Sequence, residues 1–159
     1  MIVYHGSDMI VNSPDIAHSY RPLDFGKGFY VTTNKEQAVR WAHRKVDIHG
    51  KNSGYVNVYE LKVEFDHFRV KSFPEDLNEW IDFVCDCRDG GTAYQDFDII
   101  IGKVANDKVF RVVDLYHTGI WDKKRAIEEI QVYPGYDQIS FISQKAIDEL
   151  LVFKTTEEV

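Results

Sequence analysis

The sequence has no long apolar run and very little cysteine. No segment approaches the roughly 18 apolar residues that a membrane-spanning helix needs. The first residues, MIVYHGSD, have neither the basic beginning nor the apolar stretch of a secretion signal. The two cysteines, Cys85 and Cys87, are separated by one residue, which matches neither a zinc-binding pair nor a redox CxxC pair. We therefore expect a cytoplasmic protein with no membrane association and two reduced thiols.

Motifs for several common chemistries are also missing. The six histidines show no HExxH pattern and no facial-triad spacing, so we expect no metal site. There is no GxSxG elbow, and the thiols lie in VCDCRD, where neighbouring carboxylates raise a thiol pKa. The segment GKGFYV lacks the third glycine of a dinucleotide-binding GxGxxG loop. Neither nucleophilic hydrolysis nor a Rossmann-type site is expected.

Positive charge is scarce, whereas aromatic residues are abundant. Lys and Arg number 19 against 26 Asp and Glu, which gives a net charge of −7. Because such a chain is not drawn to phosphate backbones, bulk nucleic-acid binding is not expected. Aromatic residues make up 14% of the chain, more than its core needs, so we expect some rings to face a ligand. The length predicts one domain covering residues 1–159.

The pattern of apolar residues predicts an α+β fold, because strands and helices are interspersed without the regular alternation of a doubly wound sheet. Strands are expected at 2–5, 29–32, 55–63, 98–101, 138–141 and 151–153. Helices are expected at 34–47, from Pro74 to the Gly90-Gly91 break, from Asp107 to near Gly119, and after caps at Asp122 and Ser143. Residues 6–28 form a long connection, which is where we expect a lid.

Three polar segments end or open predicted strands. His5-Gly6-Ser7 ends the first strand, residues 25–30 lead into the second, and residues 136–138 open a late one. Glycines at 26 and 28 allow a tight turn that presents Tyr30 from the strand that follows. Taken alone, these segments contain a structural histidine, a core tyrosine and a solvated glutamine, Gln138. Their order along the chain gives them a second interpretation.

In that order the segments resemble the ADP-ribosyltransferase superfamily, in its diphtheria-toxin and poly(ADP-ribose)-polymerase-like branch, whose signature is His, Tyr and Glu on three strands. His5-Gly6-Ser7 resembles the HG[ST] strand end, and FGKGFYVTTN resembles the FGKG[IF]Y segment, while Gln138 takes the place of the glutamate. The layout is most similar to small bacterial members that are often paired with an antitoxin. The resemblance implies one domain of two packed, mainly antiparallel sheets flanked by helices.

The resemblance also implies NAD as the substrate, no metal, and a catalytic set of His5, Tyr30 and Gln138. The Gly6 backbone would pair with the nicotinamide carboxamide, and the Ser7 hydroxyl would add a hydrogen bond. Tyr30 would stack on the nicotinamide ring, while His5 would bind the adenosine ribose. Gln138 would orient the 2′-hydroxyl of the nicotinamide ribose as the glycosidic bond breaks.

Further positions belong to this expected NAD site. Trp41, eleven residues after Tyr30, would close the other face of the nicotinamide. Ala38 stands eight residues after Tyr30, where relatives often have a serine. The anionic pyrophosphate of NAD would be met by Arg21 and Lys27 in the long connection.

A glutamine cannot act as a base, so we expect transfer of a single ADP-ribose rather than a polymer. The expected partners are NAD, a macromolecular acceptor and a small antitoxin protein. Two alternatives stay open: an NAD glycohydrolase, in which water is the acceptor, and a non-catalytic nucleotide- or partner-binding module of the same fold.

Overall fold

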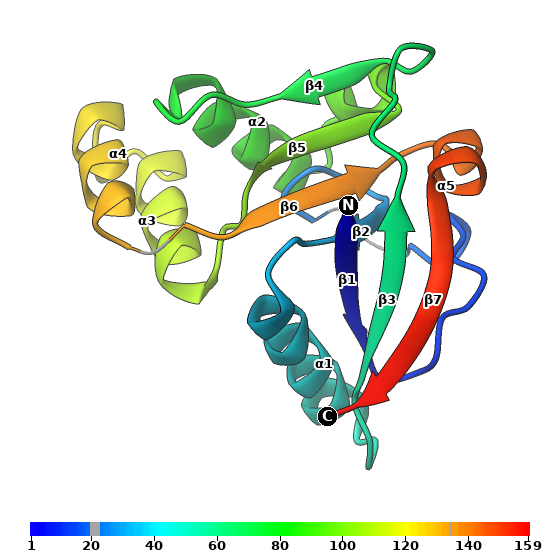
Figure 1. Ribbon diagram of the computed structural model, residues 1–159. Coiled ribbons are helices and arrows are strands. Elements are labelled where there is room, and N and C mark those ends of the chain that lie inside the picture. The colour runs from blue at the N-terminus through cyan, green and yellow to red at the C-terminus, as the bar shows by residue number, and fades with distance from the viewer. Residues whose placement is uncertain (20–22, 134) are drawn as a thin grey trace.

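The computed structural model describes residues 1–19, 23–133 and 135–159, which form two sheets and five α-helices (Figure 1). The predicted α+β fold with mainly antiparallel sheets is confirmed. The strands are β1 (Ile2–Ser7), β2 (Phe29–Val31), β3 (Tyr55–Leu61), β4 (Val70–Ser72), β5 (Ile99–Lys103), β6 (Asp137–Phe141) and β7 (Leu151–Glu158). The helices are α1 (Lys35–His49), α2 (Asn78–Arg88), α3 (Asp107–His117), α4 (Lys123–Val132) and α5 (Gln144–Leu150), with a 3-10 turn, η1 (Ala93–Asp96).

The two sheets meet where β1 lies beside the end of β2. One sheet has the order β1-β3-β7 and the other β2-β6-β5-β4, and only the β4–β5 pair is parallel among the described strands. Tyr4 and Thr32 exchange two backbone hydrogen bonds, of 2.8 and 2.9 Å, which connect β1 to the residue after β2. Elements of both sheets are therefore fixed relative to each other at the predicted site.

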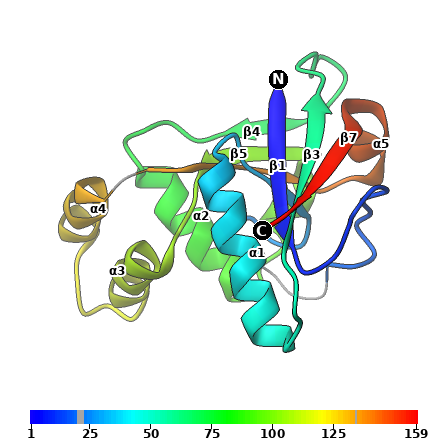
Figure 2. The same cartoon turned by 60° about the horizontal axis from the view of Figure 1, so that its bottom comes forward.

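Helices α1 to α4 cover the outer faces of the sheets, whereas α5 packs into the cluster between them through Ala146, Ile147 and Leu150. Helix α1 lies along β1 and β3 (Figure 2), where Ala38 packs with Val56 and Val58. Helices α2, α3 and α4 cover one face of the four-stranded sheet in a core that contains Tyr30 and Trp80. The other face of that sheet meets the three-stranded sheet through a second apolar cluster, built around Val3, Phe29, Val31, Tyr59, Ile139 and Phe141. Strands β2 and β6 are consequently buried on both faces.

The helix caps are largely as the sequence predicts. The side chains of Asn34, Asp122 and Ser143 each accept a hydrogen bond from a backbone N–H in the first turn of α1, α4 and α5. Helix α2 does not begin at Pro74, because the buried Leu77 has a left-handed conformation with φ of 63° and separates that proline from the helix.

Strand lengths differ more from the predictions. Strand β3 ends at Leu61, whereas the prediction runs to Val63, which is exposed. Strand β7 continues past Phe153 to Glu158, because its backbone pairs along all of β3 even where its side chains are polar. Strand β4 and η1 are too short to leave a periodic pattern, so the sequence does not predict them.

The described part of the long connection is hydrogen-bonded to β3 and α5. The Val11 N–H donates to the buried Asn57 side chain at 2.9 Å, and the Ile16 N–H donates to Gln144 at 3.0 Å. Leu23 and Gly26 exchange two backbone hydrogen bonds, and Gly26 has a φ of 80°, as expected for a tight turn before Tyr30. Within the described residues, no helix combines the length and apolar character needed to cross a membrane.

Candidate functional site

His5 is held in one orientation and one protonation state. Its Nδ1 lies 2.6 Å from the Tyr30 carbonyl, and its ring stacks on Phe29 with centroids 4.3 Å apart. Burial lowers the pKa of His5 to about 3, with nearby Lys45 acting in the same direction. A carbonyl oxygen only accepts, so the neutral ring carries its proton on Nδ1. Its Nε2 is then a hydrogen-bond acceptor.

Gly6 lies where the contact between β1 and β2 ends. The N–H and C=O of Tyr4 point toward Thr32. Because the backbone groups of every second residue in a strand point to the same edge, the N–H and C=O of Gly6 also point to this edge and away from β3. A longer ladder would pair Gly6 with Tyr30, but no bridge joins them, and the Tyr30 carbonyl contacts the His5 ring instead. The Gly6 peptide is therefore buried at a strand edge where its N–H and C=O have no partner on β2.

Glycine is required at this position. A Cβ on Gly6 would lie 1.9 Å from the Ala38 carbonyl oxygen and 2.7 Å from the Ala42 nitrogen. Because only glycine permits this contact, α1 packs directly on the strand end. The alanine eight residues after Tyr30, Ala38, belongs to this contact.

Tyr30 and Gln138 lie on the same face of the four-stranded sheet, since Tyr30 pairs with Ser140 and Gln138 is two residues earlier on β6. The Tyr30 ring is buried in the core beneath α2 and α3. Its hydroxyl donates to the Gly26 carbonyl at 2.6 Å and accepts from the Phe25 N–H at 3.0 Å. Burial, reinforced by a nearby carboxylate, raises the pKa of Tyr30, so the phenol stays protonated.

The other predicted site residues are more dispersed. Ser7 is buried at the end of β1, and its hydroxyl lies 3.4 Å from the Asp8 carboxylate. Trp41 is half-buried on α1, and among the described residues its ring makes no aromatic pair with Tyr30. Lys27 is exposed in the turn before β2. Arg21 lies outside the described residues.

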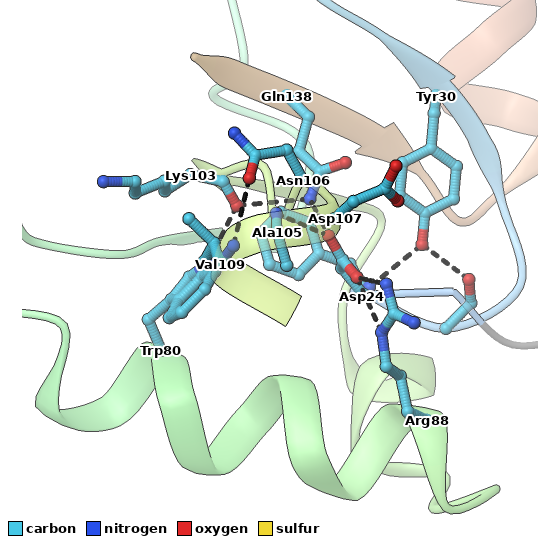
Figure 3. A network of polar contacts seen from close by, with 12 residues as sticks. Asp24, Tyr30, Trp80, Arg88, Lys103, Ala105, Asn106, Asp107, Val109 and Gln138 are labelled. Atoms are coloured by element: carbon cyan, nitrogen blue, oxygen red, sulfur yellow. Dashed lines mark hydrogen bonds and ion pairs between the residues drawn. The ribbon is translucent and has the colours of Figure 1, made fainter. Parts of the chain in front are cut away.

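A buried carboxylate, that of Asp24, connects Gln138 of the predicted site to α2 and to the segment that follows β5 (Figure 3). It accepts from Arg88 of α2, from the Ala105 N–H at 2.9 Å and from Gln138 Nε2 at 3.0 Å. Gln138 Nε2 also donates to the Lys103 carbonyl at 3.2 Å, and that carbonyl accepts from the Trp80 indole. The glutamine of the predicted site is thus part of a hydrogen-bonded network in the protein interior.

A second polar group lies beside the end of β1. The Asp8 carboxylate lies 2.9 Å from His49 Nδ1. Burial would raise the pKa of Asp8, but the hydrogen bond from His49 and the charges of His49 and Lys45 outweigh it and lower that pKa. Burial lowers the pKa of Lys45, one turn before His49 on α1, against an opposing effect of Asp8. These side chains give the Ser7 end of β1 a mixed charge rather than a purely anionic one.

The two cysteines are buried and free. Burial, with smaller contributions from neighbouring carboxylates, raises the pKa of Cys85 to about 11 and that of Cys87 to about 12. The predicted direction is confirmed, and neither thiol is a ready nucleophile. Across the parts of the chain that the structure describes, no three His, Cys, Asp or Glu side chains are grouped to hold a metal ion.

Sequence reasoning assigns no role to Asp24, Arg88 or Lys45. Asp24 adjoins the FGKG segment, but its partners Arg88 and Gln138 are 64 and 114 residues away, so no local pattern reveals them. Lys45 belongs to a basic run that is typical of a solvated helix face. Its place one turn after Ala42, on the face that packs against Gly6, is the signal that marks its partly buried position.

Comparison with known proteins places these residues in one family. Residues 1–153 match the family described as "Protein of unknown function (DUF3990)". No curated protein matches the chain. The matched span includes every strand and helix that contributes to the site, from β1 into β7. The chain therefore belongs to the DUF3990 family of proteins of unknown function.

Proposed function

We propose that the protein is an NAD-dependent mono-ADP-ribosyltransferase, acting as the toxin of a bacterial toxin–antitoxin pair. The observation that carries this proposal is the Gly6 peptide, buried at the edge of β1 where its pairing with the residues after β2 ends, next to the neutral His5 whose Nε2 is able to accept a hydrogen bond. A carboxamide brings one donor and one acceptor edge, and a ribose brings hydroxyl donors. The groups of the site are complementary to both.

NAD also needs a platform for its nicotinamide ring and a partner for its pyrophosphate. The Tyr30 ring becomes available for stacking when residues 25–28 move aside, since Phe25 and Gly26 bond its hydroxyl, while Asp24 keeps its contacts with Arg88 and Ala105. Lys27 is exposed on this same segment, so it stays able to approach the pyrophosphate. We therefore assign residues 25–28 as the part of the connection that opens.

The reaction breaks the bond between C1′ of the ribose and the nicotinamide nitrogen. Nicotinamide leaves with the bonding electron pair as a neutral molecule, the acceptor attacks C1′, and the acceptor's proton passes to solvent. Gln138 contributes a hydrogen bond to the ribose 2′-hydroxyl that strengthens as positive charge develops. It takes up no proton, which favours transfer of a single ADP-ribose to a macromolecule.

Incubation of the purified protein with NAD labelled in its adenosine part, together with cell extract, tests the proposal. We expect label on macromolecules and a matching loss of NAD. Loss of NAD with free labelled ADP-ribose and no labelled macromolecule would identify a glycohydrolase. The absence of both label transfer and NAD loss would contradict the proposal.

A non-catalytic nucleotide- or partner-binding module is the second candidate. It is favoured by the internal bonds of two proposed catalytic groups, since the Tyr30 hydroxyl and Gln138 Nε2 are already paired within the chain. Calorimetry distinguishes the two functions. Tight NAD binding without release of nicotinamide would support the binding module over the enzyme.

A further inference from the structure

The side-chain amide of Gln138 has its orientation set by its neighbours. Its terminal group lies 3.0 Å from Asp24 Oδ2 and 3.2 Å from the Lys103 carbonyl, and both of these oxygens are acceptors. An amide oxygen turned toward them would meet two oxygens of like partial charge, so Nε2 must be on that side. Gln138 Oε1 is then directed away from both, and it accepts no hydrogen bond from any of the described residues.

Asp24 is itself held rigidly. Its carboxylate is buried and accepts from Arg88 Nε at 2.8 Å, from Arg88 Nη2, and from the Ala105 N–H at 2.9 Å (Figure 3). The Arg88 guanidinium is fixed in turn by the Phe110 ring, whose centroid lies 3.8 Å away. A carboxylate with this many fixed donors cannot rotate to follow Gln138, so Gln138 must follow Asp24.

We propose that Asp24 is a positioning residue, which holds Gln138 so that Oε1 faces the 2′-hydroxyl of the nicotinamide ribose. This inference rests on the proposed function. The two residues act together. Gln138 supplies the acceptor atom that contacts the hydroxyl, and the Asp24 carboxylate, paired on its other side with Arg88, accepts from Gln138 Nε2 and so polarises the amide as the ribosyl cation develops.

The first test is Asp24→Asn in the full chain. The substituted side chain is an amide that either donates or accepts, so Gln138 is no longer held in one orientation, and the charge behind it is lost. We expect kcat for nicotinamide release to fall about 10- to 100-fold, with KM for NAD changed less than about threefold. The matched control is Asp66→Asn, at an exposed aspartate between β3 and β4, which should leave both constants unchanged.

The second test is Gln138→Glu, alone and combined with Asp24→Asn. In the single variant the Arg88 contact with Asp24 stays intact, and the new carboxylate takes the place of an amide that lies 3.0 Å from Asp24. Two carboxylates this close retain a shared proton, so we expect activity to rise only at alkaline pH. In the double variant, the amide at position 24 donates to the carboxylate at position 138, and activity near neutral pH should exceed that of either single variant.

The outcomes separate this inference from the proposed function. If the wild type is active and Asp24→Asn keeps the same kcat, the positioning role of Asp24 is wrong while the proposed function stands. A Gln138→Glu variant with the pH profile of the wild type overturns it as well, and this result stands even if Asp24→Asn fails to fold. If the wild-type protein releases no nicotinamide, the proposed function is wrong, and so is the positioning role of Asp24 that rests on it.

Discussion

At the scale of single residues, the neutral state of His5 gives the protein a particular sensitivity to acid. The folded protein keeps His5 unprotonated down to a pKa of about 3, whereas the unfolded chain protonates it near 6.5. Between these values the unfolded state binds more protons than the folded state. Stability is therefore lost as the pH falls below about 6.5, before the carboxylates titrate.

We predict that the free energy of unfolding drops by about 3 kcal/mol from His5 alone between pH 6.5 and 4. His5→Asn, whose amide can replace the Nδ1 donor to Tyr30, should flatten the pH dependence in that window. Urea unfolding at several pH values measures the slope. The exposed His43→Asn variant serves as the control, and an equal slope in His5→Asn and wild type would show that His5 is not the source.

At the scale of elements, the contact between α1 and β1 depends on one missing side chain. The nearest backbone atoms leave no room for a Cβ at Gly6, and they belong to α1, which cannot yield as a flexible side chain would. We predict that Gly6→Ala destabilises the protein by about 3 kcal/mol or more, because the helix must shift away from the strand.

Denaturant unfolding of Gly6→Ala measures this cost. Gly135→Ala is the matched control, because a Cβ there meets nothing nearer than 3.6 Å, at Lys103 Nζ, and the cost should stay within about 1 kcal/mol. Equal denaturant midpoints for the two variants would show that α1 does not pack directly against Gly6.

The elements themselves were largely predictable, and the errors have physical causes. Helix starts marked by a capping side chain, such as those at Asn34 and Ser143, are correct because the cap is a local interaction. The start of α2 is wrong because Leu77 takes a left-handed conformation at a buried position, which no local rule anticipates. Strand β4 depends on its pairing with β5, which is a long-range contact.

At the scale of the whole molecule, the candidate site exists only where the two sheets meet. His5 and Gly6 come from one sheet, Tyr30 and Gln138 come from the other, and the backbone hydrogen bonds between β1 and Thr32 fix the junction. The motifs allowed these residues to be named from sequence. The hydrogen bond between Asp24 and Gln138 and the enclosure of the Tyr30 ring could not be predicted, since both follow from packing between distant segments.

The proposed function requires that these residues act together as one NAD-cleaving site. Quantifying nicotinamide released from NAD, with cell extract as the source of acceptor, tests it most directly in wild type, Gln138→Ala and the exposed-residue control Gln95→Ala. We predict release by the wild type and the control, and a rate about 100-fold lower for folded Gln138→Ala. No release by the wild type, or equal release by Gln138→Ala, would show that these residues do not form an NAD-cleaving site.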